Sequence, residues 1–207
     1  MPLNATHFRA ALAAALVISA SRAGAHSFGT GSDAFEAFVE GSNAVLFSPY
    51  ALLPCLSLGL LLTLWQIEGM LKAWPTLIAG HVAGFLLAPL VGGWVIVTLV
   101  AAGAGMATLA ALLGRHVRAE ALLLSLLTGG LTMLVSLEGH GWLELSPSIY
   151  VGIFAAASFA VAAGAGVARL ALEQLPYAWT RIGLRIAASW LAAIQVLMVA
   201  FLLAPTA

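Results

Sequence analysis

Long apolar segments separated by short polar connections dominate the sequence from residue 49 onward. Each segment is close to the roughly 20 residues that an α-helix needs to cross the hydrocarbon core of a membrane. We therefore predict an all-α fold, a polytopic six-helix membrane domain over residues 49–207. Its transmembrane helices are expected over residues 49–66, 74–91, 94–113, 121–137, 149–172 and 182–204.

The first 25 residues, MPLNATHFRAALAAALVISASRAGA, have a different pattern. Arg9 precedes a short apolar run, and the segment ends in the small residues Ala-Gly-Ala, which is typical of a cleavable secretory signal peptide. The alternative is a first transmembrane helix, but the apolar run is short for a membrane span. Cleavage after Ala25 would make His26 the first residue of the mature chain.

Residues 26–48 mix acidic and aromatic side chains and read HSFGTGSDAFEAFVEGSNAVLFS. Such a mixture favours a short interfacial or amphipathic segment over a span. We therefore predict that this N-terminal segment lies outside the cytoplasm, ahead of the membrane domain.

The composition agrees with a membrane protein. Hydrophobic residues make up 62% of the chain and charged residues only 8%, whereas about 25% of a soluble domain is charged. The formal net charge is zero, so no overall basic field indicates nucleic-acid binding. Cys55 is the only cysteine, which excludes an internal disulfide and a thiolate metal cluster.

The basic residues after position 25 predict an orientation. All of them fall in or beside alternate connections, and the opposite connections contain neither Lys nor Arg; the basic residues are Lys72, Arg115, Arg118, Arg169, Arg181 and Arg185. Basic residues are retained on the cytoplasmic side of membranes. We therefore predict a bacterial inner-membrane protein whose mature N- and C-termini are both periplasmic.

Small residues are concentrated inside several predicted helices, as in the segments AAGAG at 101–105, TGG at 128–130 and AAGAG at 162–166. Small side chains let helix backbones approach closely in lipid, where no hydrophobic force drives helices together. We therefore expect a tightly packed bundle.

His81 is the main candidate for chemistry within the bundle. An ionisable residue at membrane depth is costly and is by default a functional hypothesis. Gly80 and Gly84 flank His81 and leave backbone space for a neighbouring helix or a bound ion. The alternative is a neutral structural histidine that donates one hydrogen bond across the bundle.

A second group of candidate ligands is expected on the outer side. His26, Asp33, Glu36, Glu138 and His140 are there, without a basic residue nearby. Imidazole and carboxylate groups suit borderline divalent cations such as nickel, cobalt or zinc. The alternative is that these are ordinary solvated residues, because their spacing matches no fixed ligand motif. A catalytic constellation is not evident, so we expect no enzyme activity.

The chain resembles the HupE/UreJ family of small membrane proteins. The resemblance is carried by the last span, TRIGLRIAASWLAAIQVLMVAFLLA, and by the Leu-rich first span, SPYALLPCLSLGLLLTLWQ. It implies a nickel or cobalt permease associated with hydrogenase or urease maturation. Ala44 and Ala51 occupy the positions where the family has its first-span histidines, so that ligand pair does not carry over.

Two functional hypotheses follow from these observations. The first is a HupE/UreJ-like divalent metal permease or metal-handling protein, in which the outer acids with His26 or His140 collect the cation and His81 assists its passage. The second is a non-transporting accessory subunit that packs against a larger membrane enzyme. The expected partners are the lipid bilayer, a divalent metal ion, and a membrane-protein complex or a second copy of the chain.

Overall fold

The computed structural model describes residues 33–113 and 118–204, and within them every regular element is helical. The predicted signal peptide and His26 lie outside the described residues. The elements are α2 (Ala34–Leu46), α3 (Pro49–Trp65), α4 (Gly69–Leu87), η1 (Ala88–Leu90), α5 (Val95–Leu112), α6 (Arg118–Ser136), α7 (Pro147–Gln174) and α8 (Ala178–Leu203). The six helices from α3 to α8 correspond to the six predicted segments.

Five of these helices, α4 to α8, are long and apolar enough to cross a membrane. Helix α3 has 17 residues and reaches that length only together with α2, from which it is bent by 71°. Residues 33–113 and 118–204 therefore contain five to six apolar helices that could span a membrane, as a multi-pass membrane protein requires.

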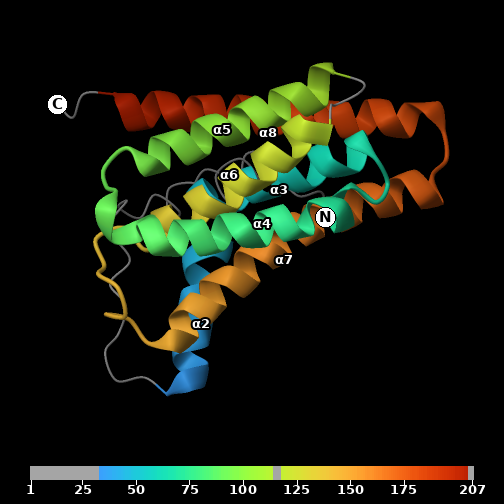
Figure 1. The fold of residues 1–207 in the computed structure, drawn as a ribbon. Helices are drawn as coiled ribbons and strands as arrows, with labels where there is room; N and C mark the ends of the chain where they lie inside the picture. Colours follow the sequence, from blue (N-terminus) through green and yellow to red (C-terminus); the bar gives the residue numbers. More distant parts are fainter. Residues whose placement is uncertain (1–32, 114–117, 205–207) are drawn as a thin grey trace, which may run out of the picture.

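The helices form a bundle in which α3 is central (Figure 1). Helix α3 packs against α5 and α7, α4 packs against α6, and α5 packs against α8. Helix α8 lies alongside α5 at one edge of the bundle, and most of its side chains are exposed. Helix α2 lies at the opposite edge beside the beginning of α7.

One end of the bundle, at the left in Figure 1, gathers the turn that follows α4 and the α6–α7 connection. There the Glu138 side chain accepts a hydrogen bond from Gly93 N at 2.5 Å, and the Trp142 indole donates to Leu86 O at 3.2 Å. These bonds tie the α6–α7 connection to the last turn of α4 and to the turn that precedes α5. Gly93 has a φ of 71°, which glycine adopts without strain.

The other end of the bundle carries basic residues. Arg185, near the beginning of α8, donates from Nε to Ala111 O at 2.7 Å and from Nη2 to Leu112 O at 3.0 Å, at the end of α5. Arg169, near the end of α7, lines a cavity with Glu68 at the α3–α4 connection. The alternating charge pattern of the sequence thus corresponds to two different ends of one bundle.

Glycines set the closest helix contacts, as the small-residue segments predicted. A Cβ atom added at Gly80 of α4 would collide with the Leu126 carbonyl group of α6, and one added at Gly129 of α6 would collide with the Leu77 carbonyl group of α4. The backbones of α4 and α6 can therefore approach only because these side chains are absent.

Helix α2 is attached to α7 in the same manner. Gly41 lies against the Ile149 carbonyl group, and Gly152 lies against the Phe38 carbonyl group. The Ser42 hydroxyl donates to Phe38 O at 2.9 Å and approaches Gly152 O at 3.3 Å. The predicted interfacial segment is therefore a helix over Ala34–Leu46 that packs tightly on the membrane domain.

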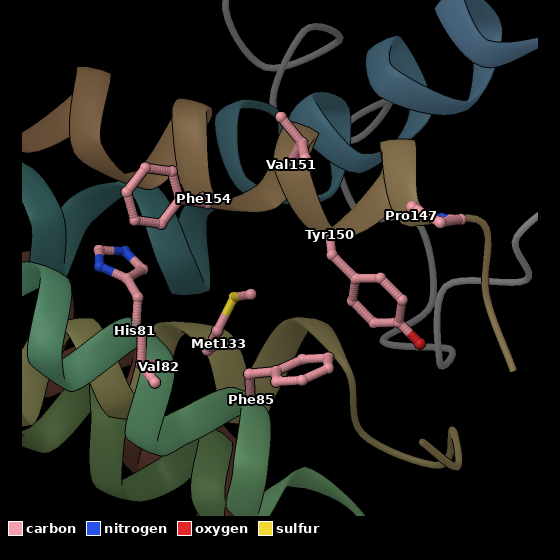
Figure 2. A pocket seen from close by; sticks show the side chains of 8 residues that line it. All are labelled: His81, Val82, Phe85, Met133, Pro147, Tyr150, Val151 and Phe154. Carbon is pink, nitrogen blue, oxygen red and sulfur yellow. The ribbon is translucent and has the colours of Figure 1, made fainter. Parts of the chain in front are cut away.

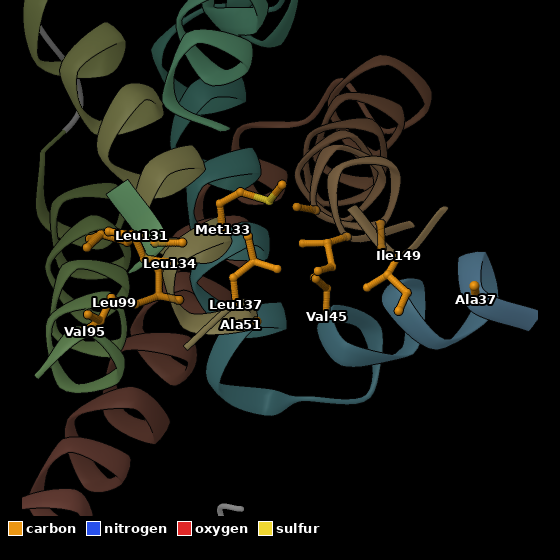
Figure 3. Packing of buried hydrophobic residues seen from close by; sticks show 14 residues of the cluster. Ala37, Val45, Ala51, Val95, Leu99, Leu131, Met133, Leu134, Leu137 and Ile149 are labelled. Carbon is orange, nitrogen blue, oxygen red and sulfur yellow. The ribbon is translucent and has the colours of Figure 1, made fainter. Parts of the chain in front are cut away.

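Two clusters of buried apolar side chains fill the bundle. The first extends from α2 to α5 and includes Val45, Leu99, Leu137 and Ile149, shown in Figure 3. The second surrounds α3 from its middle to its C-terminal part and includes Leu58, Leu61 and Leu62. Because α3 contributes to both clusters, it links the two halves of the core.

Candidate functional site

His81 lies past the middle of α4 and is 1% exposed. Gly80 and Gly84 of α4 face α6, and Gly129 of α6 faces the turn that contains His81. The space beside His81 that the sequence predicted is thus occupied by the α6 backbone. This close packing fixes the backbone of α4 at His81, and therefore the point from which the imidazole extends.

The imidazole is held by its own helix. His81 Nδ1 lies 2.8 Å from the Leu77 carbonyl oxygen, one turn earlier in α4. A carbonyl oxygen only accepts hydrogen bonds, which assigns the proton to Nδ1. In an uncharged ring, Nε2 then presents a lone pair that can accept a hydrogen bond or bind a metal ion. The hydrogen bond expected across the bundle is therefore replaced by one within α4.

His81 Nε2 is buried and has no hydrogen-bond partner within residues 33–113 and 118–204. A buried polar atom without a partner costs about 1–3 kcal/mol. Ser136 Oγ, Ser158 Oγ and Gln195 Oε1 are further such atoms. The nearest open space is a cavity of about 320 Å³ that begins at the imidazole (Figure 2).

The cavity lies between α4 and α7, with α6 behind it. Almost all of its wall is apolar, and its lining includes His81, Val82 and Phe85 of α4, Met133 of α6, and Tyr150, Val151 and Phe154 of α7. The Phe154 ring packs edge-on against the imidazole, with centroids 5.0 Å apart. The cavity wall is therefore apolar, and the His81 ring borders it while Nε2 stays buried.

The described outer candidates have structural roles in caps and connections. Asp33 caps α2 and accepts from Phe35 N at 2.9 Å and Glu36 N at 2.8 Å. Glu36 is exposed in the first turn of α2. Glu138 holds Gly93 in the α6–α7 connection, and the backbone N–H of His140 in that connection donates to Leu137 O at 3.1 Å.

The described part of the chain contains no group of three or more His, Cys, Asp or Glu side chains placed to hold a metal ion. Asp33 and Glu36 lie on α2, Glu138 and His140 lie in the α6–α7 connection, and His81 lies within α4. His26 falls outside the described residues. Assembly of the outer residues with His81 into one metal pathway thus stays a prediction.

A second buried polar residue, Gln195 of α8, was not among the sequence candidates. It is 0% exposed, and its Nε2 donates to Ser57 Oγ at 2.9 Å and to Leu191 O at 3.0 Å. Gly103 of α5 leaves the space that the Gln195 carboxamide fills. A glutamine in the middle of an apolar segment is a readable signal, because polar side chains in a span usually bond across helices.

Comparison of the chain with known protein families, with curated proteins and with solved structures found no match.

Proposed function

We propose that the chain is a bacterial inner-membrane protein with six spans, α3 to α8, after a cleaved signal peptide. Its support is the distribution of basic residues: Arg169 and Arg185 lie at one end of the bundle, and the α6–α7 connection at the other end contains neither Lys nor Arg. Basic residues favour the cytoplasmic side. Helix α2 would then lie at the periplasmic surface, where its 71° bend from α3 turns it away from the span.

Cysteine labelling tests this orientation. In a Cys55→Ala background, we expect Thr206→Cys to react with a membrane-impermeant maleimide in intact spheroplasts, and His116→Cys to react only after permeabilisation. The reverse pattern, or labelling of both residues in intact spheroplasts, would contradict the six-span arrangement.

We further propose that this membrane protein handles a divalent transition metal as its cargo, in the manner of HupE/UreJ-like nickel or cobalt permeases. The observation that supports this proposal is the geometry of His81. Its Nδ1 is engaged by the Leu77 carbonyl group, which leaves the buried Nε2 lone pair without a hydrogen-bond partner in the described part of the chain, beside a cavity that the His81 ring borders. Metal-binding imidazoles have this arrangement, in which the second nitrogen donates to a backbone carbonyl. Met133 and Tyr150 line the same cavity and carry a thioether sulfur and a hydroxyl group.

Accumulation of nickel and cobalt in cells tests the metal proposal. We expect higher accumulation in cells that express the chain than in cells without it, and loss of the difference in His81→Ala. The matched control is His116→Ala, which removes a histidine from the predicted cytoplasmic connection and should leave uptake unchanged. Equal accumulation with and without the chain would refute the proposal.

The second candidate function is a non-transporting subunit of a larger membrane complex. It is favoured by α8, whose apolar face is exposed along its whole length, including Trp190, Ile194, Leu197 and Phe201. Purification in mild detergent should then recover a stoichiometric partner, and Ile194→Arg should release that partner while the chain stays folded. A particle with the mass of one chain would count against this function.

A further inference from the structure

A second cavity lies at the basic end of the bundle, between α3, α4 and α7. Its volume is about 370 Å³, and it is bounded by the last turn of α3, the α3–α4 connection, the first turns of α4 and the later part of α7. Thr63 Oγ1 of α3 donates to Ala165 O of α7 at 3.1 Å, and both residues line the cavity. Because α4 makes few contacts with α7, the cavity separates these two helices.

The cavity opens sideways, through apolar residues. Ile67 and Leu71 line it and are 51% and 75% exposed. On α7, Gly166 contributes no side chain, and a Cβ atom there would meet open space. The lining of α7 extends from Arg169 back to Ala162, seven residues or about 10 Å at 1.5 Å per residue. When α4 and α7 span a membrane, the opening therefore faces lipid from the headgroup level into the hydrocarbon.

Two side chains of opposite charge, Glu68 and Arg169, line this cavity. Lys72 Nζ lies 3.2 Å from Gln66 Oε1 but 3.8 Å from Glu68 Oε2, which is too long for a hydrogen bond. The Glu68 carboxylate is therefore paired with Lys72 by charge alone. Its oxygens can accept hydrogen bonds from a ligand.

Arg169 also retains donors for a ligand. It donates from Nε to Glu173 at 2.6 Å, which uses one of the five N–H groups of a guanidinium. With Lys72 and Glu173 included, positive and negative charges at the cavity are equal in number. The cavity thus offers one cation and one anion side by side and does not have the excess of basic residues that selects anionic lipid headgroups.

A ligand that fits this lining has an anion and a hydrogen-bonding cation at one end and an apolar body at the other. Phosphatidylethanolamine has these groups: its phosphate can accept from Arg169, its primary ammonium can donate to Glu68, and its acyl chains suit the apolar opening. Phosphatidylcholine has the phosphate, but its quaternary ammonium has no N–H group. Phosphatidylglycerol has the phosphate but no cation. Trp74 lines the deeper part of the cavity, where an indole suits the membrane interface.

We propose that this cavity binds one phosphatidylethanolamine molecule from the adjacent leaflet, with its phosphate on Arg169 and its ammonium on Glu68. The proposal rests on the proposed membrane arrangement, because α4 and α7 must both cross the bilayer. It does not depend on metal transport or on which end of the bundle is cytoplasmic.

Native mass spectrometry of the full chain in detergent tests this site, with three added phospholipids that have the same acyl chains. We expect phosphatidylethanolamine to bind the wild type about twofold to fivefold more tightly than phosphatidylcholine or phosphatidylglycerol, the gain of one exposed charge pair. Gly166→Leu, which fills the cavity, should abolish this preference. Gly105→Leu is the matched control, because Gly105 also has open space but does not line the cavity.

Two charge variants separate the parts of the headgroup. Glu68→Gln should bind phosphatidylethanolamine and phosphatidylcholine equally, since it removes the partner of the ammonium. Arg169→Met should weaken the binding of both lipids by a similar factor, since both contain the phosphate. Glycerophosphoethanolamine, which has the headgroup without acyl chains, should not displace the bound lipid at equal concentration.

Equal binding of the three lipids to the wild type, a preference that persists in Glu68→Gln or in Gly166→Leu, or displacement by glycerophosphoethanolamine would overturn the proposal. If Gly166→Leu does not fold, the exposed substitution Glu68→Gln decides the outcome. Loss of the lipid preference with the expected cysteine labelling would refute this site alone. A preference for phosphatidylethanolamine with the reverse labelling would refute only the proposed orientation.

Discussion

The close contact between α4 and α6 predicts different losses of stability for alanine substitutions at two adjacent glycines of α6, Gly129 and Gly130. A Cβ atom at Gly129 would lie closer than 3.0 Å to the Leu77 carbonyl oxygen and 3.1 Å from His81 N. A Cβ atom at Gly130 would meet its nearest neighbour, the Gly80 carbonyl oxygen, at 3.4 Å, which is an ordinary contact distance. Gly129→Ala should therefore force the helices apart by at least 0.4 Å, from 3.0 to 3.4 Å, whereas Gly130→Ala should be accommodated.

The size of the effect follows from the comparison of these two variants. Both replace glycine by alanine in the same helix, so the gain in helix propensity of about 1 kcal/mol cancels in their difference. What remains is the cost of overpacking, about 1–3 kcal/mol. We expect Gly129→Ala to be less stable than Gly130→Ala by this amount in reversible unfolding by SDS in mixed micelles. Equal stability of the two variants would refute the helix register described for α4 and α6.

Three further predictions concern other contacts, and the first two use the same unfolding assay. Gln195→Met removes the bond to Ser57 at similar volume and should cost about 0.6–1.7 kcal/mol, the range of hydrogen bonds between membrane helices; no loss would contradict the observed bond. Arg185→Ala removes the hydrogen bonds to the last carbonyl groups of α5 and should lower the free energy of unfolding by about 0.3–1 kcal/mol. Arg181→Ala, the matched substitution one turn earlier in α8, should lower it by less. Gly152→Val should detach α2 from α7, which increased proteolysis of residues 34–46 would report; unchanged cleavage would argue against this contact.

The sequence predicted the helical segments well because length and apolarity are sufficient to identify them. Their ends were less accurate, since charged residues ended the predicted segment but not the helix. Helix α4 begins at Gly69 rather than Trp74, and Lys72 lies 3.8 Å from Glu68 one turn earlier. Helix α7 ends at Gln174 rather than at residue 172, and its last turn contains Glu173, which accepts a hydrogen bond of 2.6 Å from Arg169. Paired charges at i and i+4 stabilise exposed helical turns.

Which small residues make contacts could not be predicted from the sequence. In each repeated AAGAG segment the first glycine is packed and the second is open: Gly103 lies against Gln195 and Gly164 against Leu56, while Gly105 and Gly166 have free space. Composition is the same at both positions of each pair. Only the rotation of the helix against its neighbour distinguishes them, and that depends on the whole bundle.

The candidate site was predicted in part. The sequence identified His81 because a histidine within an apolar segment is unusual, and its burial is confirmed. The cavity beside it could not be foreseen, because residues of α4, α6 and α7 from distant parts of the chain line it. The outer acids were grouped by their predicted side of the membrane, but a shared side does not bring side chains within ligand distance.

The packing glycines and the candidate site are physically linked. Thr128 bonds to Met106 of α5 and Thr132 to Cys55 of α3. Some other buried hydroxyl groups bond within their own helix, as Ser57 does to Leu53 O at 2.9 Å and Ser125 to Ala121 O at 2.7 Å. Such bonds do little to select a helix partner, so close backbone contact at glycine carries that specificity in the α4–α6 pair. Gly129 contacts both the Leu77 carbonyl group and the His81 ring nitrogen that bonds to it. The contact that joins α4 to α6 therefore also holds the imidazole in the orientation in which Nδ1 bonds to Leu77 and Nε2 has no hydrogen-bond partner in the described part of the chain.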